Sequence, residues 1–106
     1  MSTSWQKLSS ETKVKKDLIE AKLHIAYAET SQFISGNADK AGAEIDKAED
    51  YLNSAAKNAD SKVKAKINAV GKKVNKAKKD LHNKKEAAKI RYEIIKGDLR
   101  QLIKDL

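Results

Sequence analysis

The stretch ADKAGAEIDKAEDYLNSAAKNA, residues 38–59, has the most regular apolar pattern in the chain. Its apolar positions alternate spacings of three and four, and they are Ala38, Ala41, Ile45, Ala48, Leu52, Ala55 and Ala59. This spacing places the side chains on one face of an α-helix. Because five of the seven are alanine, such a helix packs close to its neighbours while each residue buries little area. The stretch predicts an amphipathic helix lying tightly against another helix.

The segment before residue 36 has the same periodicity. Its main apolar stripe consists of Val14, Leu18, Ala21, Ile25 and Ala28, and we expect four flanking residues to widen the core-facing surface: Ile19, Leu23, Ala26 and Phe33. Ser9 and Ser10 are good capping residues, so the helix is expected to begin there. Gly36 supplies a left-handed position after its end, and Asn37 is expected to cap the next helix. Two antiparallel helices joined by this short turn form a helical hairpin.

The remainder of the chain continues the pattern, with one change of phase. Asn58 or Asp60 is expected to cap a third helix whose apolar positions are Val63, Ile67, Val70, Val74, Ala77 and Leu81. A last set is again in phase: Ala88, Tyr92, Ile95, Leu99, Leu102 and Leu106, with Ile90, Ile94 and Ile103 beside them. The change of phase after Leu81 indicates either a stutter in one long helix or a turn at residues 82–83. Asn83 followed by Glu86 resembles a capping box and favours the turn.

These patterns predict one all-α domain over residues 1–106, an antiparallel bundle of three or four helices. The helices are expected near 10–35, 37–57, 60–81 and 84–105, and the alternative merges the last two into one long helix. Alanine, Glu, Lys, Leu and Arg make up half the chain, and proline is absent, which is typical of long-helix proteins. Leu, Ile, Val and Phe total only 22 of 106 residues, so we expect a homo-oligomer that gains further burial.

The basic residues are concentrated in one segment. Residues 61–85 contain one acid, Asp80, and ten lysines: Lys62, Lys64, Lys66, Lys72, Lys73, Lys76, Lys78, Lys79, Lys84 and Lys85. The segment carries a net charge of +9, against +8 for the whole chain. Three interpretations fit it: a solvated outer helix face, which is the preferred one, a sequence-nonspecific site for a polyanion such as nucleic acid, or an anionic membrane surface. Without arginine or aromatic residues, the segment is not suited to reading bases.

Groups that could support catalysis are few. Glu20 and His24 lie one turn apart and could share a metal, but we expect a solvent-facing pair, and we expect His82 to be a turn residue. The acids of the second helix, Glu44, Asp46, Glu49 and Asp50, are expected on its polar face, solvated or weakly paired with a lysine-rich neighbour. The scattered glycines form no phosphate-binding loop, and Gly42 and Gly71 are expected to allow close helix approach.

Cysteine is absent, which excludes thiolate metal sites, and no apolar run approaches the roughly 18 residues of a membrane span. The sequence therefore predicts no enzyme, no cofactor, no metal and no small-molecule substrate. The competing class is a small enzyme or metal carrier that uses Glu20 and His24. The start MSTSW lacks a charged-then-apolar leader. We expect a periplasmic or exported protein if a signal peptide has been removed, and a cytoplasmic one otherwise.

Residues 17–56 resemble the helical hairpin of YfdX-type bacterial proteins. The likeness rests on Asp17-Leu-Ile-Glu-Ala-Lys22, Gly36-Asn-Ala-Asp-Lys-Ala41 and Ile45-Asp-Lys-Ala48, an amphipathic helix, a Gly-Asn turn and a second helix. The resemblance implies an all-helical, exported, stress-associated protein without a known active site, and no functional residue carries over. The function expected from the sequence is that of a non-enzymatic, self-associating bundle with a binding, scaffold or stress-associated role. The alternative is binding of anionic macromolecules or membrane surfaces through residues 61–85.

Overall fold

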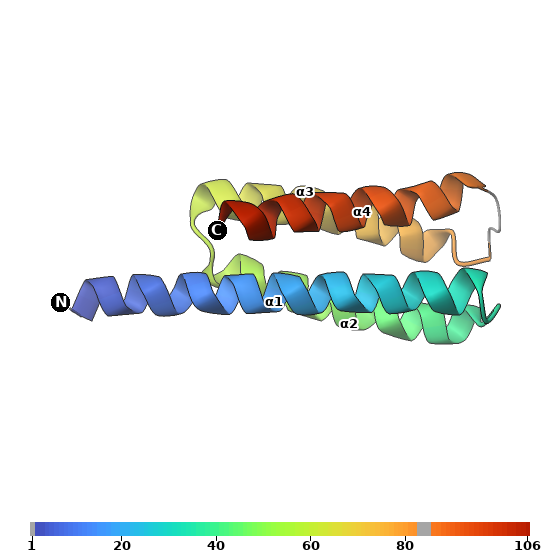
Figure 1. The fold of residues 1–106 in the computed structure, drawn as a ribbon, viewed down its shortest axis with the longest axis horizontal. Helices are drawn as coiled ribbons and strands as arrows, with labels where there is room; N and C mark the ends of the chain where they lie inside the picture. The colour runs from blue at the N-terminus through green and yellow to red at the C-terminus, as the bar shows by residue number, and fades with distance from the viewer. Residues whose placement is uncertain (1, 83–85) are drawn as a thin grey trace.

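The computed structural model describes the backbone of residues 2–82 and 86–106, and the side chains from residue 10 onward within those ranges. Over these residues the chain forms four helices, α1 (Ser2–Phe33), α2 (Ala38–Asn58), α3 (Ser61–Lys79) and α4 (Glu86–Asp105), and no strand. They run antiparallel in succession and form an elongated bundle 52 Å long (Figure 1). The predicted all-α antiparallel bundle is confirmed. The alternative of one long final helix is wrong, because α3 ends at Lys79 and residues 80–82 form a turn.

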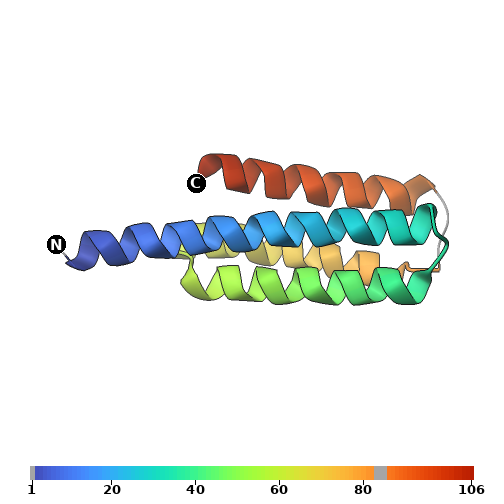
Figure 2. The ribbon, with the colours of Figure 1, turned by 60° about the horizontal axis from the view of Figure 1, so that its bottom comes forward.

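The bundle is built from two hairpins that lie on each other as two layers. α1 packs on α2 and α4, and α3 packs on α2 and α4, whereas the backbones of the diagonal pairs stay more than 8 Å apart, Cα to Cα, in the described part of the chain. The most extensive contact joins α1 and α2. With 32 residues against 19–21 in the others, α1 extends beyond the bundle at its N-terminal end (Figure 2).

The α1–α2 turn has the chemistry that the sequence indicates. Gly36 has a φ of 66°, the left-handed conformation that glycine adopts without steric penalty. The Asn37 N–H donates to the Ser31 carbonyl at 2.8 Å, which satisfies a carbonyl at the end of α1. The Asn37 side chain accepts a hydrogen bond from the Lys40 N–H at 3.0 Å and so caps α2. This turn fixes the antiparallel approach of the two helices.

Some helices begin or end at other residues than expected, because a possible capping residue does not always end a helix. α1 begins at Ser2 rather than near residue 10, because no glycine or proline interrupts the first 35 residues and Ser10 lies inside the helix. Asp60 caps α3, accepting from the Val63 N–H at 2.9 Å. α3 ends two residues early, where the Asp80 N–H bonds the Ala77 carbonyl in a tighter turn. The Asn83 cap and the expected helix start at residue 84 lie outside the described residues.

The core follows the predicted stripes. Nearly every stripe residue is buried, from Val14 on α1 to Leu102 on α4, and Leu81 and Leu106 are half-buried at the helix ends. Two pairs of residues beside the stripes are not buried in the core as expected. Ile19 and Leu23 on α1, and Ile90 and Ile94 on α4, are 41–50% exposed. Because each helix packs against only two neighbours, only a narrow stripe faces the core, and these positions lie outside it.

A buried polar network joins the two hairpins at the end of the bundle near the α1–α2 turn. The Tyr92 hydroxyl of α4 donates to Gln32 Oε1 of α1 at 2.5 Å, and Gln32 Nε2 donates to the Asp80 carbonyl at 3.0 Å. Tyr92 and Gln32 are 1% and 3% exposed, and Phe33 packs edge-on against the Tyr92 ring. Arg91 forms an ion pair with the Asp80 side chain. These contacts fix the register of α4 against α1, because a buried hydroxyl without a partner is costly.

The close α1–α2 contact predicts the effect of a larger side chain. Ala48 is fully buried on the packed face of α2, so Ala48→Leu should lower the free energy of unfolding by about 1–3 kcal/mol through overpacking. Ala43 lies on the same helix but is exposed, and Ala43→Leu should change it by less than about 0.5 kcal/mol. Urea unfolding followed by circular dichroism measures both. Equal effects would contradict the proposed close packing.

The pKa of Tyr92 predicts a loss of stability at alkaline pH. Burial, with a smaller contribution from the charge of Glu29, raises this pKa from 10.0 to about 12. The folded state thus holds the phenol proton more tightly than the unfolded chain. This raised pKa contributes about 2–3 kcal/mol to the free energy of unfolding. The contribution is complete below pH 10 and is lost as the pH rises through 12. Unfolding free energies of wild type and Tyr92→Phe should therefore converge between pH 10 and 12. Parallel profiles would show that the phenol proton contributes nothing.

Candidate anion-binding surface

The lysine-rich segment is helix α3, and α3 itself contains no acidic residue. Eight of the ten predicted lysines belong to this helix: Lys62, Lys64, Lys66, Lys72, Lys73, Lys76, Lys78 and Lys79. Lys84 and Lys85 lie outside the described residues. The polar face of α3 therefore holds positive charge along its whole length.

Two of the eight lysines are neutralised by neighbouring helices. Lys78 Nζ lies 2.5 Å from Asp46 Oδ1 and 3.7 Å from Glu49 Oε1, both on α2. The hydrogen bond to Asp46 is the main cause that raises the pKa of Lys78. Lys73 Nζ lies 2.6 Å from Asp98 Oδ2 on α4. Their sequence neighbours Val74 and Ala77 are core residues, so these two lysines start from the edges of the buried stripe and reach the adjacent helices.

Six lysines remain exposed, and none of them has an acidic partner among the described residues: Lys62, Lys64, Lys66, Lys72, Lys76 and Lys79. Lys72, Lys76 and Lys79 follow one another at spacings of four and three, on the face of α3 opposite its buried stripe. We call these three residues the outer lysine row. They span about 10 Å along the helix.

Two acidic residues, Glu29 of α1 and Glu93 of α4, are engaged by a lysine outside α3. Lys96 of α4 bridges Glu29 of α1 at 2.6 Å and Glu93 of its own helix at 2.8 Å. The hydrogen bond to Glu29, followed by that to Glu93, raises the pKa of Lys96, and the hydrogen bond from Lys96 lowers the pKa of Glu93. These ion pairs join α1 and α4, and they leave the charge of the outer lysine row unbalanced.

The Glu20–His24 pair that the sequence predicts is present, but the imidazole is largely shielded from solvent and its closer partner is Glu44. His24 Nδ1 lies 2.6 Å from Glu44 Oε2 on α2, whereas Nε2 lies 3.9 Å from Glu20 Oε2. The imidazole is stacked on Tyr51, with ring centroids 5.5 Å apart. The expected solvation of Glu44 is likewise wrong, whereas Asp46 and Glu49 do pair with a lysine of α3. Throughout the described residues, no three His, Cys, Asp or Glu side chains are grouped so as to hold a metal ion.

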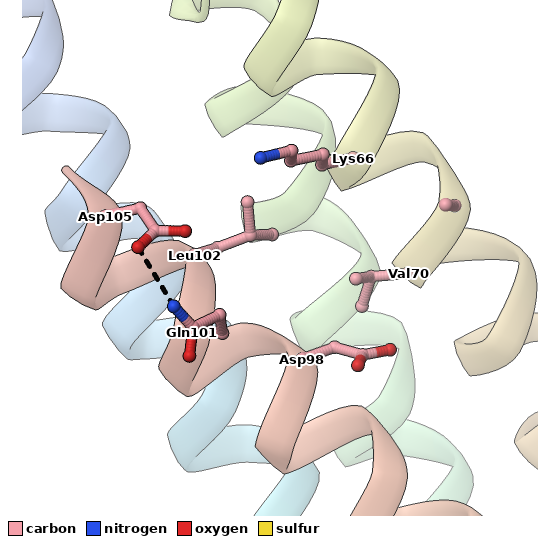
Figure 3. A pocket seen from close by; sticks show the side chains of 7 residues that line it. Lys66, Val70, Asp98, Gln101, Leu102 and Asp105 are labelled. Atoms are coloured by element: carbon pink, nitrogen blue, oxygen red, sulfur yellow. Dashed lines mark hydrogen bonds between the residues drawn. The ribbon is translucent and has the colours of Figure 1, made fainter.

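A groove of about 280 Å³ lies between α3 and α4 (Figure 3). Val70 and Leu102 form its apolar floor, and Lys66 stands at the rim. The opposite rim is acidic: Asp98 is the partner of Lys73, and Asp105 accepts a hydrogen bond from Gln101 at 2.9 Å. Because these two acids offset the positive charge of Lys66, this groove does not extend the basic surface.

The helical glycines behave differently from one another. A Cβ added at Gly42 would lie 3.1 Å from Leu81 Cδ1, so glycine allows the expected close approach there. At Gly71 an added Cβ would meet nothing within 4 Å, and the same prediction is wrong. His82 lies exposed in the turn after α3, as expected.

The part of the chain that the structure describes contains no helix with the length and apolar character needed to cross a membrane. No protein-family model, curated protein or solved structure matches the chain.

Proposed function

We propose that the chain is a non-enzymatic binding protein that holds linear polyanions on the outer face of α3. The proposal rests on one observation: six lysines on an acid-free helix are exposed and have no acidic partner among the described residues. Such an unbalanced field attracts anions and raises their local concentration. Lys73 and Lys78 take no direct part, because Asp98 and Asp46 already neutralise them.

The composition of this face favours a polymer over a membrane surface. The residues between its lysines are small or polar, including Ala65, Asn68, Ala69 and Asn75. A helix that lies on a membrane buries large apolar side chains beneath the headgroups, and this face has none to insert. Lysine is a compact point charge without the bidentate geometry that reads bases. Binding should therefore depend on charge and not on nucleotide sequence.

The outer lysine row predicts a salt-dependent interaction. Lys72, Lys76 and Lys79 changed together to Gln should reduce the slope of log affinity against log salt by about 3, because fewer counterions are released. Helicity should persist, since Gln is a good helix former. Fluorescence anisotropy with labelled DNA between 50 and 200 mM salt measures the slope.

The matched control changes Lys13, Lys15 and Lys16 of α1 to Gln, which removes the same charge from exposed residues of a helix that lies diagonally across the bundle from α3. Its slope should stay close to that of wild type. Equal slopes for the two triple variants would locate the effect in net charge alone, and no DNA binding at low salt would refute the proposal.

A second candidate function is self-association through α1. Ile19, Leu23 and Tyr27 follow one another at spacings of four and are 48%, 41% and 48% exposed. This half-exposed apolar row lies outside the packed stripe, and a second copy that covers it would bury apolar area that the monomer leaves in water. It would also compensate for the alanine-rich core.

The apolar row predicts a concentration-dependent oligomer. Leu23→Gln should shift a dimer to monomer in sedimentation velocity, because it places a polar group in the middle of the row, and should leave monomer helicity unchanged. Ile34→Gln is the matched control: Ile34 is 80% exposed and follows the end of α1. A wild-type chain that stays monomeric at high concentration would reject self-association.

A further inference from the structure

A second groove, of about 270 Å³, lies between α2 and α3, beside the outer lysine row. Its lining includes three asparagines from the two helices, Asn53, Asn68 and Asn75, together with Gly71 at mid-helix and Lys72. Leu52 and Ile67, both core residues, also line it. Unlike the groove between α3 and α4, this one is mainly polar in its lining.

Residues that disfavour helices are gathered in this groove. Within the four described helices, asparagine occurs at Asn53, Asn68, Asn75 and, as the last residue of α2, Asn58. The three interior asparagines all line the groove. Asparagine and glycine have low helix propensity because asparagine competes for backbone hydrogen bonds and glycine loses more entropy. Several residues that disfavour the local helix, gathered at one place, indicate a functional surface.

Packing does not require Gly71. A Cβ at this position would meet no atom within 4 Å, so alanine would fit and would be a better helix former. The effect of glycine here is to keep the groove open. Gly42 differs, because Leu81 occupies the space beside it at 3.1 Å.

The polar groups of the groove have unused hydrogen-bonding capacity. The amides of Asn53, Asn68 and Asn75 make no hydrogen bond to another described residue. Glu49, which also lines the groove, is paired with Lys78, whose Nζ lies 3.7 Å from Glu49 Oε1. Amide groups can both donate and accept hydrogen bonds. A ligand with several hydroxyl groups supplies such donors and acceptors together.

We propose that this groove binds a sugar unit that carries a carboxylate. Its hydroxyls exchange hydrogen bonds with the asparagine amides, while its carboxylate lies against Lys72, one turn before Lys76. The inference rests on the anion binding proposed for α3 and names its ligand class, an acidic sugar, either free or as a unit of an acidic polysaccharide.

The test compares two polyanions of equal carboxylate number, with and without hydroxyl groups. Oligogalacturonate should bind the full chain about tenfold more tightly than oligoacrylate in isothermal titration at low salt, because only the sugar oligomer forms the groove hydrogen bonds. Saturable binding of galacturonic acid alone would support a free sugar acid as the ligand. A preference confined to the oligomers would support the polymer as its source.

Variants of the groove residues distinguish binding in the groove from binding by net charge alone. One variant is Gly71→Ala, and a second combines Asn68→Ala with Asn75→Ala. Each should reduce the tenfold preference for oligogalacturonate to less than about twofold. Each should also raise or maintain the melting temperature, since alanine favours the helix. Oligoacrylate affinity should stay unchanged. Gly97→Ala is the matched control: Gly97 is also a helical glycine with open space beside it, but it lies on α4 and does not line the groove.

The outcomes distinguish the two proposals. Equal affinity of wild type for the two oligomers, or a preference that survives the groove variants, would overturn the groove inference and leave anion binding by α3 intact. Loss of binding to both oligomers would instead overturn the proposed function. The titration with galacturonic acid alone would then still test binding in the groove.

Discussion

The close contact between α1 and α2 is the constraint on which the bundle depends. Ala21 and Ala28 of α1 meet a face of α2 that carries Ala41, Ala48 and Ala55, and all five are completely buried. Small side chains let two helices approach at the short end of the usual interaxial distances, about 8 Å. Such a contact is rich in dispersion but removes little apolar area per residue from water. Larger core side chains come from both hairpins: Leu18, Ile25 and Ile45 from α1 and α2, and Tyr92, Leu99 and Ile67 from α3 and α4.

The two-layer arrangement also decides which charges are neutralised. A lysine at the edge of a buried stripe reaches the next helix, as Lys73 and Lys78 do, whereas a lysine on the opposite face finds no acid. Like charges one turn apart, such as Lys72 and Lys76, destabilise an isolated helix by a few tenths of a kcal/mol. The outer lysine row thus contributes nothing favourable to folding. Its place on a helix without acids is consistent with the anion binding proposed for α3.

The periodicity of the sequence predicts the buried stripe of each helix, because spacings of three and four carry the information that packing uses. It does not predict how wide the buried face is, since that depends on the number of neighbouring helices, and so Ile19 and Leu23 were expected in the core. Contacts between distant residues leave no local signal. The bonds of His24 to Glu44 and of Tyr92 to Gln32 join residues 20 and 60 positions apart. For the same reason the sequence predicts the lysines as a group but not which of them have partners.

Packing and the proposed binding use opposite faces of the α2–α3 pair. The alanine face of α2 holds the hairpin to α1, and the stripe from Ile67 to Ala77 holds α3 in the core. The remaining faces of these two helices contain three interior asparagines, an open glycine and a run of lysines, all of which weaken a helix standing alone. Most helical stability in proteins comes from tertiary packing of an apolar face. A well-packed inner face therefore permits an outer surface whose residues disfavour the isolated helix, as the proposed binding of an anionic, hydroxylated ligand requires.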